Sequence, residues 1–121
     1  DPIGPAAPLF GPEFYENVKK RLTPEGVVVA QGECPFYRLD VQKALARVVR
    51  GVFGAAAMYN YHNLTYPGGL WSFVAASKSP RDLTAPDAAR VAALQPQLRY
   101  YNAETHKAAF ALPEFMKRGL E

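Results

Sequence analysis

The sequence predicts an α/β fold that forms the back half of a larger sheet. Residues 26–31 are a short, β-branched apolar run between two stretches of helical periodicity, and residues 55–61 and 70–77 are two further strand-like stretches. The predicted order is therefore loop, helix, strand, helix, strand, strand, helices. Such a small sheet makes a poor independent core, so we expect this chain to need another polypeptide.

The N-terminal residues predict a loop followed by a helix. Residues 1–11 contain three prolines and two glycines, a composition typical of a loop rather than of a helix or strand. Pro12 suits the first turn of a helix. Phe14, Val18 and Leu22 then recur at every fourth position, which predicts the buried stripe of that helix.

The apolar run at 26–31 predicts a strand that is buried on both faces, as in a parallel sheet covered by helices. No parallel neighbour for this strand follows in the chain. A long helix is predicted over 36–53, and its buried face is expected to consist of Leu45, Val48, Val49 and Val52.

The second half of the chain predicts two strands and several short helices. A Tyr-Pro-Gly-Gly turn at 66–69 separates the stretches at 55–61 and 70–77, which indicates an antiparallel pair. After a polar linker, the sequence predicts a helix at 87–94, an extended segment at 100–102 and two terminal helices at 104–110 and 113–120.

Composition excludes several classes of protein. The chain has 121 residues, a net charge of +3, seven Phe, seven Tyr and one Trp, which argues against disorder and against nucleic-acid binding. A single cysteine excludes an internal disulfide framework and a Cys-cluster zinc site. The apolar runs are shorter than the roughly 20 residues that span a bilayer. We therefore expect a cytoplasmic protein with no membrane segment.

Polar residues at element ends are the candidate site. No phosphate-binding, metalloprotease or nucleophile-elbow motif is present, and Cys34 is more typical of a packed residue than of a nucleophile. Ligands of open α/β sheets bind beyond the carboxyl ends of strands. The residues expected there are Asp1, Gln31, Glu33, Tyr66 and Trp71. Carboxylates and aromatic faces can hold a cationic amine, although acids at strand ends also serve as helix caps.

Four segments resemble the motifs of spermidine synthases, the aminopropyltransferase family. Residues 1–6 resemble the second part of its D-S-x-D-P-x-G-P-A loop, and residues 29–33 resemble its strand-end Gln-x-Glu. Residues 65–71 resemble its T-Y-P-[SG]-G turn. Residues 100–113 resemble its Y-Y-N-x-x-x-H-x-A-A-F-x-L-P signature. The motifs occur in family order and cover essentially the whole chain.

The resemblance implies transfer of an aminopropyl group from decarboxylated S-adenosylmethionine to putrescine, without a metal or other cofactor. It implies that residues 1–121 are the C-terminal half of a Rossmann-like, methyltransferase-like doubly wound domain that ends in an antiparallel strand pair. The N-terminal β domain and the nucleotide-binding half are absent from this sequence and would come from an upstream polypeptide. Three explanations stay open: a separate chain supplies that part, the polypeptide was cut, or the sequence is a domain fragment. Family members are usually dimers or tetramers.

The resemblance also implies a role for each candidate residue. Asp1 and Tyr66 would hold and orient the attacking amine. The expected general base is an Asp three positions upstream of Asp1, outside this sequence. Gln31 and Glu33 would line the amine channel, with Glu33 toward the distal ammonium, and Trp71 would form its wall. The residues implied for the nucleotide are Pro5, Ala6 and Leu9.

Two alternatives remain open at this point. The chain could be a non-catalytic regulatory or binding subunit that keeps the fold. It could also belong to an aminopropyltransferase with another acceptor, such as agmatine, cadaverine or spermidine.

Overall fold

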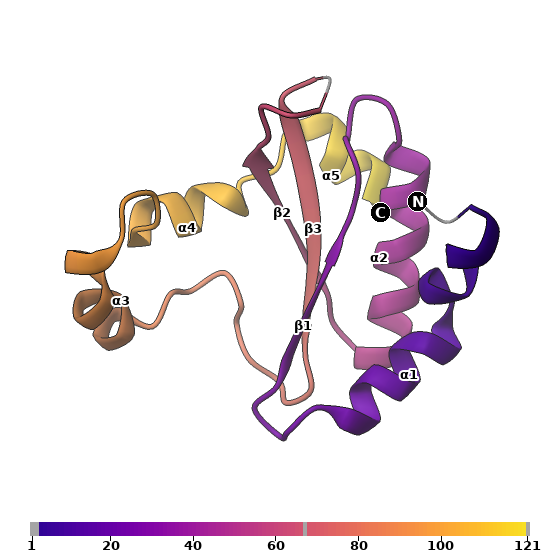
Figure 1. Cartoon of the computed structure of the whole chain (residues 1–121), viewed down its shortest axis with the longest axis horizontal. Helices are drawn as coiled ribbons and strands as arrows, with labels where there is room; N and C mark the ends of the chain where they lie inside the picture. Colours follow the sequence, from indigo (N-terminus) through magenta and orange to yellow (C-terminus); the bar gives the residue numbers. More distant parts are fainter. Residues whose placement is uncertain (1–2, 67, 121) are drawn as a thin grey trace.

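The computed structural model of the chain describes residues 3–66 and 68–120. It consists of a three-stranded sheet with the first two α-helices on one side, the C-terminal helix packed against the longer of these two, and an arm of short helices on the other side (Figure 1). The elements are the 3-10 helices η1 (Gly4–Phe10) and η2 (Gln95–Gln97), the strands β1 (Val27–Gln31), β2 (Ala57–His62) and β3 (Leu70–Ser77), and the helices α1 (Pro12–Arg21), α2 (Leu39–Phe53), α3 (Ala88–Leu94), α4 (Ala103–Ala109) and α5 (Glu114–Leu120).

The central strand of the sheet is β3, and the strand order is β1-β3-β2. The predicted antiparallel pairing of β2 with β3 is confirmed, with Ala57 opposite Ala75 and His62 opposite Leu70. β1 also pairs antiparallel with β3, an arrangement that the sequence did not reveal. This second pairing places Gln31 opposite Phe73, although the two residues are far apart in the sequence.

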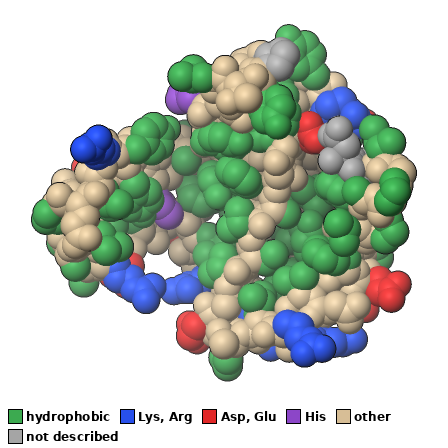
Figure 2. Space-filling model, in the orientation of Figure 1, with side chains coloured by type: hydrophobic (Ala, Val, Ile, Leu, Met, Phe, Trp, Pro, Cys, Tyr) green, Lys and Arg blue, Asp and Glu red, His purple; other side chains and the backbone are tan. Residues whose placement is uncertain are grey.

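β1 differs from the prediction of a strand buried on both faces. Its exposure alternates along the strand, and Val27 and Val29 are 39% and 49% exposed, respectively. Val28 and Ala30, on the other face, pack against the core. The reason is that the first two α-helices cover the face of Val28 and Ala30, whereas only the short helical segment at 103–110 approaches the opposite face, on the side of the other edge strand. Figure 2 accordingly shows hydrophobic side chains at the surface along both sides of this strand.

The core lies between the sheet and the helices α1 and α2. Its buried residues are Tyr15, Leu45, Ala46, Val49, Met58, Val74 and Ala76. The predicted apolar face of α2 is confirmed in its main features, since Leu45 and Val49 are buried and Val48 and Val52 pack against the cluster. In α1 the fully buried position is Tyr15 rather than Phe14, whereas Val18 and Leu22 of the predicted stripe are half-buried. Phe14 instead packs edge-on against the Tyr15 ring at 5.3 Å.

Two predicted boundaries need correction. The N-terminal segment predicted as a loop contains η1, in which a proline stands in the first turn. A short 3-10 helix tolerates this because the amide that proline lacks has no partner at a helix start. The helix predicted from residue 36 begins at Leu39, because the backbone carbonyl of Cys34 accepts hydrogen bonds from the amides of Tyr37 and Arg38 and closes a turn first.

The short C-terminal helices occur where the sequence predicts them. Asp87 caps α3 by accepting a hydrogen bond from the Arg90 amide at 3.0 Å. Asn102 and Thr105 form a reciprocal capping box at the start of α4. Among residues 3–66 and 68–120, no helix combines the length and hydropathy that crossing a membrane requires.

The buried Tyr15 makes the stability of the fold sensitive to alkaline pH. Burial raises the pKa of its hydroxyl above the ordinary value of 10.0. The unfolded chain therefore ionises first, so this contribution is intact below pH 10 and is lost as the pH rises toward the folded-state pKa. We expect Tyr15→Phe to flatten the decline of the free energy of unfolding above pH 10, measured by urea denaturation. An unchanged alkaline slope would contradict this assignment.

Candidate functional site

The end of β1 is held to β3 by hydrogen bonds that continue beyond the strand. The Gly32 amide donates to the Ser72 carbonyl at 2.8 Å, and the Ser72 amide donates to the Glu33 carbonyl at 3.0 Å. Gly32 is required here, because a Cβ at this position would lie 2.7 Å from Ser72 Oγ and 3.1 Å from Met58 Cε. These contacts bring the backbone of Glu33 next to Ser72.

Glu33 is an acidic residue in an unusual position. It is only 8% exposed, and its φ of 70° lies in the left-handed region that non-glycine residues rarely adopt. Within the described part of the chain its carboxylate forms no ion pair. An acidic side chain in this position can pair with a cationic ligand.

An aromatic pair lies at the same end of the sheet. The rings of Tyr66 and Trp71 stack with centroids 4.6 Å apart and planes inclined by 25°. Tyr66 is half-exposed, whereas Trp71 is only 8% exposed. The indole Nε1 of Trp71 has no hydrogen-bond partner among the described residues. An aromatic stack can cover the alkyl chain of an amine and attract its positive charge.

The turn that carries Tyr66 packs on the segment after Glu33. Gly68 and Gly69 have φ values of 90° and 65°, and the Asn63 amide closes the turn by donating to the Gly69 carbonyl at 2.9 Å. A Cβ at Gly68 would lie 3.1 Å from the Sγ of Cys34, so the turn and the strand end are in close contact. Cys34 is a buried free cysteine in this contact.

The fold thus gathers four of the candidate residues at one end of the sheet: Gln31, Glu33, Tyr66 and Trp71. Gln31 is exposed, opposite Phe73 at the last position of β1. Pro5, Ala6 and Leu9 lie on η1, which packs against α1. Asp1 lies outside the described residues. The roles predicted for all these positions remain predictions.

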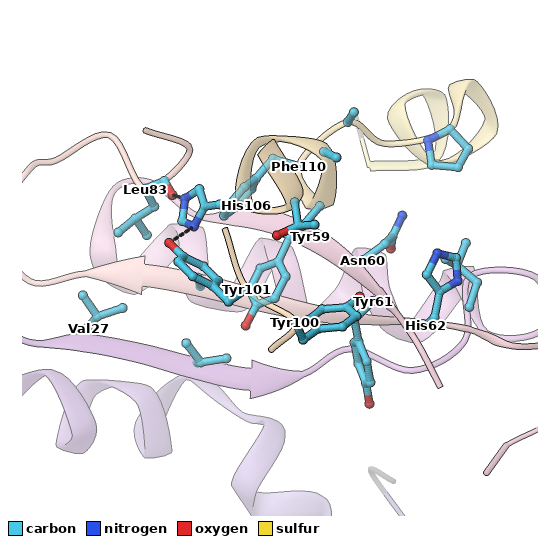
Figure 3. A pocket seen from close by; sticks show the side chains of 18 residues that line it. Val27, Tyr59, Asn60, Tyr61, His62, Leu83, Tyr100, Tyr101, His106 and Phe110 are labelled. Atoms are coloured by element: carbon cyan, nitrogen blue, oxygen red, sulfur yellow. Dashed lines mark hydrogen bonds between the residues drawn. The ribbon is translucent and has the colours of Figure 1, made fainter. Parts of the chain in front are cut away.

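Sequence reasoning missed a second feature, an aromatic cavity of about 660 Å³ between the sheet and α4. Figure 3 shows Tyr59 and Tyr61 of β2 facing it together with Tyr101, His106 and Phe110. His106 connects its parts, because Nδ1 lies 3.0 Å from the Tyr101 hydroxyl and Nε2 lies 3.0 Å from the Leu83 carbonyl. In the sequence, the Tyr-Tyr-Asn and His positions of the C-terminal motif were the signal that could have indicated this cavity.

The aromatic cavity and the acidic site are distinct. None of the residues that line the cavity is acidic, and none is Gln31, Glu33, Tyr66 or Trp71. Burial, followed by the proximity of Tyr61, raises the pKa of Tyr59 above its ordinary value. The cavity therefore has no charge to balance an ammonium group and resembles an uncovered packing face. Over the described ranges, no group of three His, Cys, Asp or Glu side chains could hold a metal ion.

Comparison with known proteins identifies related sequences. The Spermine/spermidine synthase domain matches residues 1–85. The polyamine aminopropyltransferase of Moorella thermoacetica is 42% identical over 123 aligned residues, covering 100% of this chain and 42% of that protein. The enzyme of the same name from Methanocaldococcus jannaschii is also 42% identical, over 97% of this chain and 41% of its own length. The chain thus spans less than half the length of these curated relatives.

Solved structures are similar as well. The crystal structure of spermidine synthase from Thermotoga maritima superposes with a TM-score of 0.86 at 38% identity, over 99% of this chain and 41% of that one. A spermidine synthase in complex with the transition-state analogue AdoDATO superposes with a TM-score of 0.84 at 38% identity, over 93% of this chain and 39% of that one. The predicted fold, the C-terminal part of a methyltransferase-like α/β domain, is confirmed.

The close contact at Gly32 can be tested by adding one methyl group. We expect Gly32→Ala to lower the free energy of unfolding by about 1–3 kcal/mol, because the Cβ collides with Ser72 and Met58. The matched control is Gly51→Ala in α2, where a Cβ meets nothing within 4 Å. This control should raise stability by about 0.5–1 kcal/mol, because alanine is the better helix former. Equal effects of the two substitutions in urea denaturation would refute the contact.

Proposed function

This chain belongs to the spermine/spermidine synthase family, and we propose that it carries the amine-binding part of an active site that transfers an aminopropyl group from decarboxylated S-adenosylmethionine to putrescine. The products would be spermidine and 5′-methylthioadenosine. The relatives named polyamine aminopropyltransferase and the spermidine synthase solved with a transition-state analogue support this assignment.

The reaction is a nucleophilic substitution. The amine nitrogen attacks the carbon next to the positively charged sulfur, a carbon–nitrogen bond forms, and the carbon–sulfur bond breaks with its electron pair going to sulfur. The amine must lose a proton to a base, and it must be held in line with the breaking bond. Because the sulfonium leaves as a neutral thioether, we propose that no metal or prosthetic group takes part.

The observation that carries this proposal is that Glu33, an acid without an ion pair among the described residues, lies at the same end of the sheet as the stacked rings of Tyr66 and Trp71. Putrescine is a dication with a four-carbon chain. An acid can bind one ammonium group, the aromatic rings can cover the methylene chain, and the Tyr66 hydroxyl can orient the other nitrogen. Gln31 and Glu33 would thus line the channel for the amine, with Glu33 at its distal end.

An upstream polypeptide is proposed to complete the site. It would supply the general base and the nucleotide-binding half, to which Pro5, Ala6 and Leu9 would add contacts. The support lies in the uncovered surface of this chain: the outer edge of β1 has no strand partner among the described residues, and Val27 and Val29 reach the surface next to the aromatic cavity. Apolar surface of this kind marks an interface.

The proposed partnership predicts complementation. The chain alone is expected to produce no methylthioadenosine from putrescine and decarboxylated S-adenosylmethionine, because base and nucleotide site are supplied from outside it. Mixing or joining it with the upstream polypeptide should restore turnover, measured by chromatography of the nucleoside product. A stable complex without turnover would instead favour a non-catalytic subunit.

The role of Glu33 predicts a selective defect. In the assembled protein, Glu33→Gln is expected to raise the KM for putrescine about 10- to 100-fold, because a charge-assisted hydrogen bond is lost, and to change the KM for the nucleotide little. Glu25→Gln, at an exposed glutamate before β1, is the matched control and should change neither. A larger effect on the nucleotide than on the amine would refute this role. Competition among putrescine, agmatine, cadaverine and spermidine identifies the acceptor.

A further inference from the structure

The backbone carbonyl of Glu33 is the centre of a buried hydrogen-bond cluster. It accepts from the Ser72 amide at 3.0 Å, from Ser72 Oγ at 3.0 Å and from Gln42 Nε2 at 3.1 Å. Gln42 Nε2 also donates to Ser72 Oγ at 2.7 Å. Both Gln42 and Ser72 are completely buried, so water does not compete for these bonds.

The chemistry of the groups fixes the direction of every bond. A carbonyl oxygen only accepts, so Gln42 must face it with its amide nitrogen, and the two N–H groups of that nitrogen are used on Glu33 and Ser72. The single Ser72 hydroxyl proton then goes to the Glu33 carbonyl. The amide oxygen of Gln42 is left buried without a partner among the described residues. A buried polar group left unpaired is costly, so an apolar side chain at this position would serve packing better.

The cluster acts on a residue in a strained conformation. Glu33 is the one non-glycine residue of the described ranges with a positive φ, at 70°. A non-glycine residue keeps a left-handed backbone conformation only where the surrounding contacts hold it there. Here three donors converge on the carbonyl of that same residue. A change of backbone from the left-handed to the extended region would also redirect the Cα–Cβ bond and hence the carboxylate.

We propose that Gln42 and Ser72 are positioning residues that hold the Glu33 carboxylate at the distal ammonium group of the amine substrate. The proposal rests on the function proposed above. Gln42 comes from α2 and Ser72 from β3, so the helix and the central strand jointly set where the charge lies. Neither side chain needs to touch the substrate, because both act through the backbone of Glu33.

The test compares Gln42→Leu and Ser72→Ala with wild type in the assembled protein. Gln42→Leu removes both amide donors at similar volume and is expected to raise the KM for putrescine about tenfold. Ser72→Ala removes one donor and keeps the backbone bond, so its expected increase is about threefold. The KM for decarboxylated S-adenosylmethionine should stay within about twofold in both variants. The matched control is Gln97→Leu at an exposed glutamine in η2, which should change neither KM.

A double-mutant cycle separates positioning from a general structural role. If Gln42 acts through Glu33, then Gln42→Leu should have no further effect on the putrescine KM once Glu33→Ala has removed the carboxylate. A merely structural role would still raise the KM in that background, or would raise the KM of both substrates together, and either result would overturn the proposal. Should Gln42→Leu fail to fold, the same cycle with Ser72→Ala decides the question.

The failure of this inference can be told apart from that of the proposed function. If Glu33→Ala itself leaves the putrescine KM unchanged, the proposed role of Glu33 is wrong, and the inference about Gln42 and Ser72 is wrong as well. If Glu33→Ala raises that KM but Gln42→Leu and Ser72→Ala do not, the proposed function stands and the positioning role alone is wrong.

Discussion

The pairing of Ser72 with Gly32 and Glu33 is the constraint on which the rest of this structure depends. It extends the β1–β3 ladder past Gln31, and it requires a glycine at position 32 because side-chain atoms of Ser72 and Met58 occupy the space beside it. Backbone hydrogen bonds in a buried location are costly to leave unmade. The strand end is therefore fixed relative to the central strand, at the end of the sheet where Tyr66 and Trp71 stack.

Charge and apolar surface are divided between two regions of the molecule. The end of the sheet has an acid and two stacked aromatic rings, which are groups that can bind a cationic amine. The cavity between the sheet and α4 is lined by aromatic and aliphatic residues and by no acid. His106 holds this second region together through Tyr101 and Leu83, so its order serves packing rather than charge recognition (Figure 3). This division agrees with the amine-binding role proposed for the first region and the interface role proposed for the second.

Local patterns predicted the elements whose signals are local. The limits of β3 agree with the prediction to the residue, and α3 and α4 begin within one residue of the predicted positions, directly after the capping residues Asp87 and Asn102. The predicted start of α2, residue 36, is three residues before the observed start at Leu39. The apolar periodicity of the helix does not reveal the turn that the Cys34 carbonyl closes before it. Phe14 was expected to be buried, but helix α1 lies on α2 with Tyr15 inward. The orientation of a helix on its neighbour depends on both surfaces, and one stripe cannot specify it.

The sequence by itself determined the residue types of the site, the order of the elements and the motifs that indicate the family, because each of these is a matter of short spacing along the chain. Only the tertiary structure decided that β1 pairs with β3, that Glu33 adopts a left-handed backbone, and that Gln42 and Ser72 meet at its carbonyl. These features depend on hydrogen bonds between residues 9 and 39 positions apart in the sequence. Such bonds form only when a helix and two strands pack together, and a local sequence pattern does not predict them.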